Sequence, residues 1–189
     1  MKYTDIPQLT KSGSYQVNVP LSYIERNVED FINELGLILE PDFQRGHVWT
    51  KEQKIKYVEF LLKGGKSARI IYFNAPWWKG NKSDYDNIYH DFVIVDGLQR
   101  LTAVLDFLQN KIQVFGLYRN EFEGRIPIDI DLIFNVNNLK TRAAVLQWYI
   151  EMNSGGTPHT TKEIERVKKL LEEERNKRLS NKDSVNNET

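Results

Sequence analysis

The segment Asp96-Gly97-Leu98-Gln99-Arg100 places an acid, a glycine, an amide and a guanidinium between an apolar strand-like run and an apolar helix-like run. The N-terminus of a helix offers free N–H groups and a partial positive charge, so it attracts anions. Gly97 would let a ligand approach the backbone closely, and Arg100 can hold a phosphate in a fork geometry. Asp96 could hold a divalent metal that bridges phosphates. Together these residue types are those of a nucleotide-phosphate cradle.

The same segment also fits a purely structural interpretation. The spacing Asp-x-x-Gln resembles a capping box, with Asp96 as the N-cap and Gln99 at the third helical position. Taken alone, this spacing favours a cap, because caps are common. A cap needs neither Arg100 nor a glycine at the first helical position, where glycine lowers helix propensity. Both interpretations therefore stay open at this point.

A second polar segment, PDFQRGHVW, lies just before a predicted helix. In the functional interpretation it is a second wall of the same pocket, with Arg45 on phosphate and Gln44 on sugar or base. His47 would then be an acid or base. In the structural interpretation it is a surface loop, and Phe43 and Trp49 pack into the core. The two interpretations weigh equally for Arg45, whereas Phe43, Val48 and Trp49 favour the structural one. A lone histidine such as His47 is more often polar surface than a catalyst.

Two further loops also allow two interpretations. The sequence NSGGTP fits a turn between helices, and it also fits a backbone anion nest that includes Asn153 and Gly155. The turn is the favoured interpretation. Trp77 and Trp78 stand beside lysines, a combination that suits base stacking, a hairpin tip or a partner-binding patch.

Composition and missing motifs exclude several classes of protein. Lysine plus arginine equals aspartate plus glutamate, 26 each, so the chain lacks the excess positive charge of a protein that coats nucleic acid. Any contact with nucleic acid must therefore be local. The 189 residues include no cysteine, which excludes disulfides and zinc-thiolate sites. The sequence lacks GxxxxGK[ST], GxGxxG, HExxH and GxSxG, and its three histidines show no metal-ligand spacing.

The elements that must position these residues follow from hydrophobic periodicity. Strands are predicted at 15–19, 69–74 and 88–96, and helices at 21–35, from Thr50, from Leu101, over 140–153 and around Ile164. This pattern predicts an α+β fold, with a small mixed sheet and surrounding helices in a single domain.

The expected domain boundaries are a loose arm at 1–13, a domain at 14–171, and a charged, mobile tail at 172–189 in which the last helix frays. The sequence shows no leader peptide and no apolar stretch long enough for a membrane span, so we expect a soluble, cytoplasmic protein.

Taken in order, FQRGHVW, VDGLQRLTA and NSGGTPHTTKEIE resemble the N-terminal domain of GmrSD-type, modification-dependent restriction enzymes and related phage-defence proteins. That family's hallmark is an Asp-Gly-Gln-Gln-Arg box after a strand. An arginine–tryptophan segment precedes the box and an Asn-x-Gly-Gly turn follows it. The resemblance covers roughly residues 20–170. It implies a ParB/sulfiredoxin-like fold.

The resemblance also implies a function. In such domains the box is associated with binding and hydrolysis of a nucleoside triphosphate with Mg²⁺, which regulates the cutting of foreign DNA. Carried onto this chain, the box residues match Asp96, Gly97, Gln99 and Arg100, the upstream arginine matches Arg45, and the late turn matches Asn153 and Gly155. The implied partners are a nucleoside triphosphate and DNA or a DNA-processing protein, with no membrane.

Two departures from the family pattern keep the alternatives open. Leu98 replaces the first glutamine of the box, so hydrolysis is expected to be weaker than binding. The chain is also too short to include the nuclease domain of larger members, so it is expected to be a stand-alone member. The first hypothesis is a Mg²⁺-dependent NTPase with Asp96, Gln99 and Arg100 as catalytic residues. The second is a binding module that acts through a partner, and the third is a ParB-like DNase or nickase.

Overall fold

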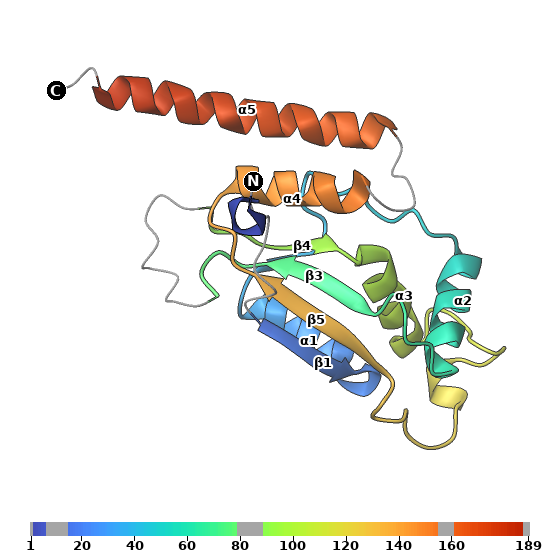
Figure 1. Cartoon of the computed structure of the whole chain (residues 1–189). Coiled ribbons are helices and arrows are strands. Elements are labelled where there is room, and N and C mark those ends of the chain that lie inside the picture. Colours follow the sequence, from blue (N-terminus) through green and yellow to red (C-terminus); the bar gives the residue numbers. More distant parts are fainter. Residues whose placement is uncertain (1, 7–14, 79–88, 155–160, 187–189) are drawn as a thin grey trace.

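The computed structural model describes residues 2–6, 15–78, 89–154 and 161–186. The strands are β1 (Tyr15–Pro20), β2 (Leu37–Ile38), β3 (Ile70–Asn74), β4 (Phe92–Asp96) and β5 (Asp131–Asn137). The α-helices are α1 (Leu21–Asn33), α2 (Lys51–Leu62), α3 (Leu98–Leu108), α4 (Arg142–Ser154) and α5 (Thr161–Asn186), and 3₁₀ turns occur at Tyr3–Asp5 and Arg119–Glu121. This architecture confirms the predicted α+β class in one domain (Figure 1). Within the described ranges, no helix is long and apolar enough to cross a membrane.

The sheet is mixed and has the strand order β1-β5-β3-β4-β2. The pairs β1–β5 and β3–β4 are antiparallel, whereas β5–β3 and β4–β2 are parallel. Phe92 and Ile94 of β4 belong to one apolar cluster, and Val93 and Val95 belong to the other. Alternate residues of a strand face opposite sides of a sheet, so β4 is buried on both faces, as its continuous apolar run predicts.

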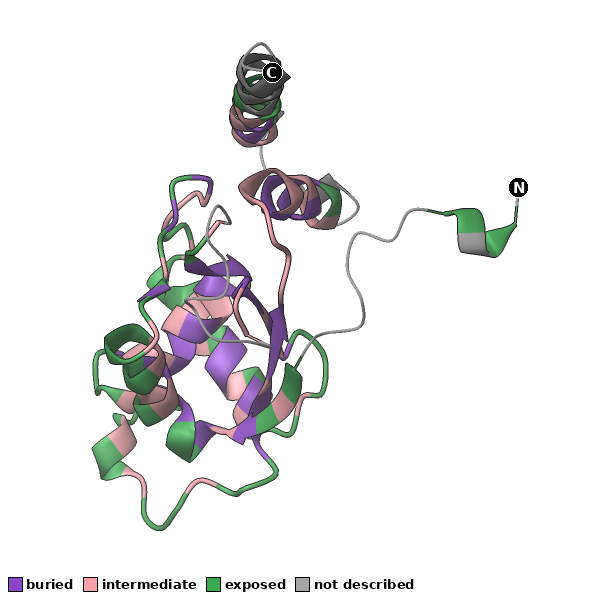
Figure 2. Cartoon of the chain, turned by 90° about the vertical axis from the view of Figure 1, so that its left-hand side faces the viewer, coloured by how far each residue is buried: buried purple, intermediate pink, exposed green. Residues whose placement is uncertain are grey.

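Helices cover both faces of the sheet in layers (Figure 1). The larger cluster joins the sheet to α1, α2 and α3, and the smaller one joins β4 to α4, α5 and Phe43. In Figure 2 the buried residues concentrate in the strands and in the helix sides that face them. The helix α4 packs between the sheet and α5, which forms the outermost layer. The start of α3 therefore lies where β4, the loop before α2 and the helical layers meet.

The last helix differs from the sequence expectation. It begins at Thr161 and continues to Asn186, although fraying was expected from Glu172. The charged residues beyond Glu172 are strong helix formers, and pairs such as Lys177 Nζ with Glu174 Oε1 at 3.1 Å stabilise a helix surface. The predicted arm (except residues 2–6) and the turn after Ser154 lie outside the described residues, and so does Gly155.

A buried ion pair and two tryptophan rings pack at the sheet. Arg69 and Asp131 form a buried ion pair at the start of β5, where Arg69 Nε also donates to the Asp131 carbonyl at 2.7 Å. The rings of Trp77 and Trp78 pack against Phe92, with centroids 6.0 and 5.8 Å apart. Both tryptophans are half-buried against the core.

Candidate functional site

The candidate site begins where β4 ends and α3 starts. Gly97 separates the two elements and is the N-cap of α3, with φ +102° and ψ 7° in the left-handed region. A Cβ at this position would lie 2.7 Å from Ile71 Cδ1 and 3.2 Å from Ile71 Cα. Both the backbone conformation and the close packing therefore require glycine.

The capping interpretation of this segment is wrong in its details. Asp96 is the last residue of β4 and pairs with Tyr72, so it is not the N-cap, and the cap of α3 makes no side-chain hydrogen bond. The Asp96 carboxylate instead accepts from the guanidinium of Arg100, one helical turn away. The two side chains are 33% and 18% exposed, so the pair lies at the solvent boundary and a ligand can reach it.

The side chain of Gln99 clamps the loop that precedes α2. Its Oε1 accepts from Val48 N at 2.9 Å and from Trp49 N at 3.0 Å, and its Nε2 donates to the Gly46 carbonyl at 2.5 Å. Both ends of the amide therefore have protein partners. This contact set holds residues 46–49 over the first turn of α3.

The upstream segment supplies the opposite wall. Gln44 Nε2 donates to the carbonyls of Ile94 at 3.2 Å and Val95 at 2.9 Å, which ties this segment to the end of β4. Arg45 Nη1 lies 3.9 Å from Glu163 Oε2, and both side chains are 26% exposed. Because this distance is long for an ion pair, Arg45 remains available to a stronger anion.

These segments enclose a hollow of about 110 Å³ that opens to solvent. Its volume is several times the ~10–15 Å³ that a single water needs, so it has room for a phosphate group. The residues that line it are Gln44, Arg45, Trp49, Asp96, Gly97, Leu98, Gln99 and Arg100. The structure thus brings together most of the residues singled out in the sequence, and Trp49, which was expected to pack into the core and does so in part, also lines the hollow.

Helix α5 anchors the wall from outside. The Arg166 guanidinium donates to the carbonyls of Asp42 at 2.6 Å, Phe43 at 3.3 Å and Gln44 at 2.9 Å. Arg142 of α4 also pairs with the Asp42 carboxylate at 2.5 Å. Sequence reasoning missed Arg166, and no local signal could have found it, because its partners are 122 to 124 residues away.

Tyr149 lies buried beneath the wall, with its ring 5.3 Å from that of Phe43. Burial raises the pKa of Tyr149 to about 12, and the positive charge of Arg45 acts in the opposite direction. The phenol therefore stays neutral under ordinary conditions and adds no charge to the site.

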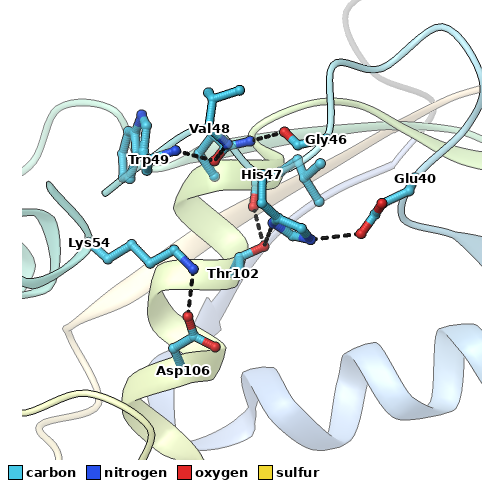
Figure 3. A network of polar contacts seen from close by, with 10 residues as sticks. Glu40, Gly46, His47, Val48, Trp49, Lys54, Thr102 and Asp106 are labelled. Carbon is cyan, nitrogen blue, oxygen red and sulfur yellow. Dashed lines mark hydrogen bonds and ion pairs between the residues drawn. The ribbon is translucent and has the colours of Figure 1, made fainter. Parts of the chain in front are cut away.

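Two of the candidate residues do not line the hollow. His47 Nε2 lies 2.7 Å from Glu40 Oε1, and its Nδ1 lies 3.4 Å from Thr102 Oγ1, in an exposed row of polar groups beside the clamp (Figure 3). Asn153 Nδ2 donates to the Tyr149 carbonyl at 2.7 Å within α4.

Asp96 is the carboxylate of the hollow that could contact Mg²⁺. Among the described residues, no group of three or more histidine, aspartate or glutamate side chains is arranged to hold a metal. Mg²⁺ is commonly bound through one or two carboxylates together with substrate phosphates and waters. Asp96 therefore fits Mg²⁺ as a single ligand, provided that a bound phosphate supplies further oxygens.

Residues 28–187 match the model of the GmrSD restriction endonuclease N-terminal domain. The chain belongs to this family. The matched range includes every element that borders the hollow, from the loop before α2 to α5. No curated protein and no solved structure gives a match. The family resemblance expected from three short motifs is thus confirmed.

Proposed function

We propose that this GmrSD N-terminal domain acts in restriction-type defence and binds the phosphates of a nucleoside triphosphate, with Mg²⁺, in the hollow at the start of α3. One observation carries the proposal. Arg45 and Arg100 come from segments 55 positions apart and line one solvent-open hollow beside the glycine N-cap of α3. Paired arginines at a helix N-terminus are an arrangement that suits a phosphate. The family name links the proposed activity to DNA.

Each residue has a distinct role in this proposal. The first turn of α3 leaves backbone N–H groups without partners in the helix, and these would donate to phosphate oxygens. Arg100 would exchange the Asp96 carboxylate for phosphate, and Arg45 would exchange Glu163 for phosphate. Asp96 would then be free to hold Mg²⁺, which would neutralise phosphate charge when bound.

Gln99 and Gln44 would act as positioning residues. Both amide groups bind protein backbone on the two sides of the hollow, so they fix the distance between its walls. A rigid hollow loses little freedom when a ligand binds, which favours affinity.

A second candidate function is nucleotide binding without turnover. Hydrolysis needs a group that orients the attacking water. Leu98 is apolar, only 3% exposed and part of the core, and the Gln99 amide has protein partners at both its oxygen and its nitrogen. The two positions that match the paired glutamines of the family box therefore present no free amide to the hollow, which favours holding over hydrolysis.

The test is a calorimetric titration with ATP, GTP, CTP and UTP, with and without Mg²⁺, alongside an assay of phosphate release. We expect at least one nucleotide to bind, and we expect Arg100→Ala to weaken it about tenfold or more, the value of one charge-assisted hydrogen bond. Arg26→Ala is the matched control, because Arg26 is 82% exposed and, among the described residues, its ion pair is with Asp30 of the same helix.

Binding with phosphate release would support the NTPase, and binding without release would support the holding module. If no nucleotide binds, or if Arg100→Ala and Arg26→Ala bind equally well, the proposed phosphate site is refuted.

A further inference from the structure

A second hollow lies at the opposite end of α3 from the phosphate site. It has a volume of about 290 Å³ and is bordered by Phe107 near the end of α3, by Leu62 at the end of α2, and by residues 115–130. Leu98 and Phe107 are nine positions apart on α3, which corresponds to about 14 Å along a helix. The long connection that forms this hollow lies at the lower edge of the molecule in Figure 1, between α3 and β5.

The floor of this second hollow is apolar and aromatic. Phe107 and Ile130 are buried, and Phe122 packs edge-on against Phe107 with ring centroids 5.8 Å apart. Ile126 completes the apolar lining. Such a floor suits a flat apolar group, because stacked and edge-on ring contacts add to the gain from burial.

The rim of the second hollow carries two arginine side chains. Arg119 and Arg125 line it, and Lys63 Nζ lies 5.2 Å from the centroid of the neighbouring Phe115 ring. Within the described part of the chain, neither arginine forms an ion pair. Glu123 is the one acidic residue in the lining. The arginine heads are therefore available to an anionic group whose apolar part occupies the floor.

Phe115 occupies a costly backbone conformation at this rim. Val114 and Leu117 exchange backbone hydrogen bonds of 2.8 and 3.1 Å around a turn in which Phe115 has φ +53° and Gly116 has φ +79°. Turns with two positive φ angles normally take Asn-Gly, and a bulky residue there is an outlier. The Phe115 side chain is nevertheless 46% exposed and lines the hollow. Strain of this kind often marks a ligand-binding position.

Polar contacts preform the rim. Asn120 N donates to Asn110 Oδ1 at 2.9 Å, and Tyr118 N donates to Glu121 Oε2 at 2.6 Å. Phe115 N donates to Glu59 Oε1 of α2 at 3.3 Å. The loop therefore has a fixed shape, which lowers the entropic cost of holding a ligand.

We propose that this hollow is a binding site for a compact aromatic anion, a group of one to three aromatic rings that carries a single carboxylate, sulfonate or phosphate. The rings lie on the Phe107 and Phe122 floor with Phe115 at the edge, and the anionic group binds Arg119 and Arg125. A neutral apolar ligand leaves both arginine heads unused, and the balanced charge of the chain argues against a long polyanion. This proposal is independent of the nucleotide site.

The first test uses the fluorescent anion 8-anilinonaphthalene-1-sulfonate and its neutral counterpart N-phenyl-1-naphthylamine. We expect one sulfonate probe to bind per folded chain, and we expect the neutral probe to bind about tenfold more weakly. Arg119→Gln and Arg125→Gln should each weaken the sulfonate probe about tenfold and leave the neutral probe unchanged. Arg26→Gln, at an exposed position of α1 that does not line this hollow, should change neither.

A second variant separates binding from folding. Phe115→Asn places a residue that favours positive φ at the strained position, so the melting temperature should hold or rise. Affinity for the sulfonate probe should nevertheless fall, because the aromatic edge of the hollow is lost.

Competition then distinguishes the sources of the anion. Displacement of the probe by indole-3-carboxylate or by AMP supports the proposal and tells a carboxylate from a phosphate. If the thymidine oligonucleotide displaces the probe and the small anions do not, the proposal is overturned and the hollow binds a nucleic-acid strand instead. Equal affinity for the two probes, or unchanged affinity for the sulfonate in a double Arg119→Gln, Arg125→Gln variant, also overturns it.

Discussion

Replacing Gln99 with leucine should detach the wall of the proposed phosphate site and lower the stability of the fold. The substitution removes three hydrogen bonds, from Val48 N, from Trp49 N and to the Gly46 carbonyl. A neutral hydrogen bond contributes about 0.5–1.5 kcal/mol, so the sum is about 1.5–4.5 kcal/mol. Water can reach part of the freed backbone, because Val48 is 44% exposed. We therefore expect a loss of about 1.5–3 kcal/mol in the free energy of unfolding.

Urea denaturation followed by tryptophan fluorescence measures this loss, because Trp49 is part of the clamp. The dependence of the free energy on urea concentration should stay constant while the midpoint falls. Hydrogen exchange at the amides of Val48 and Trp49 should accelerate more than exchange in β4.

Two further variants make this prediction specific. Gln109→Leu is the matched control, because Gln109 is exposed at the other end of α3 and makes only a backbone hydrogen bond among the contacts described. Gln99→Glu keeps both acceptor contacts but sets a carboxylate oxygen against the Gly46 carbonyl, so it should destabilise too. If Gln99→Leu lies within about 0.5 kcal/mol of Gln109→Leu, the clamp makes no net contribution and the reasoning fails.

Three other predictions follow from the same structure. Gly97→Ala should lower the free energy of unfolding by about 2–4 kcal/mol, because it adds backbone strain and a contact of 2.7 Å with Ile71. The melting temperature should fall, and a value like that of the unchanged chain would contradict this. Asp131→Asn should cost about 3–5 kcal/mol in urea denaturation, because it leaves the Arg69 charge buried without its partner; a loss below about 1 kcal/mol would show that water reaches Arg69. Burial raises the pKa of Tyr149 to about 12, so its contribution to stability is complete below pH 10 and is lost as the pH rises toward 12. Tyr149→Phe should remove one late-titrating phenol from the tyrosinate absorbance, and an unchanged titration would place the shift elsewhere.

Local patterns in the sequence predicted the elements well. At the start of α2, Thr50 Oγ1 accepts from Gln53 N at 3.3 Å and Gln53 Oε1 accepts from Thr50 N at 2.8 Å, so a capping box begins the helix that the sequence predicts from Thr50. Capping chemistry involves residues three positions apart, so the sequence alone can reveal it.

The segment at Asp96 shows where such reasoning stops. The spacing of Asp96 and Gln99 matches a capping box as well as the spacing of Thr50 and Gln53 does. Asp96 nevertheless ends β4 and pairs with Arg100. The decision depends on contacts with β3 that no local pattern encodes, as does the anchoring of the wall by Arg166. The grouping of Arg45 with Arg100 was predicted from motif order, whereas the second hollow arises from packing between distant segments.

The anchoring of the wall by α5 also sets the order in which this protein becomes competent during its synthesis. Gln44 leaves the ribosome 122 residues before Arg166, the residue that holds its carbonyl. At a synthesis rate of about 5–20 residues per second, Arg166 is therefore made about 6–24 s after the segment that it anchors. The hollow at the start of α3 is therefore completed only after the sheet and α3 have been made, so under the proposed function a nascent chain that is still being extended does not yet hold a phosphate firmly.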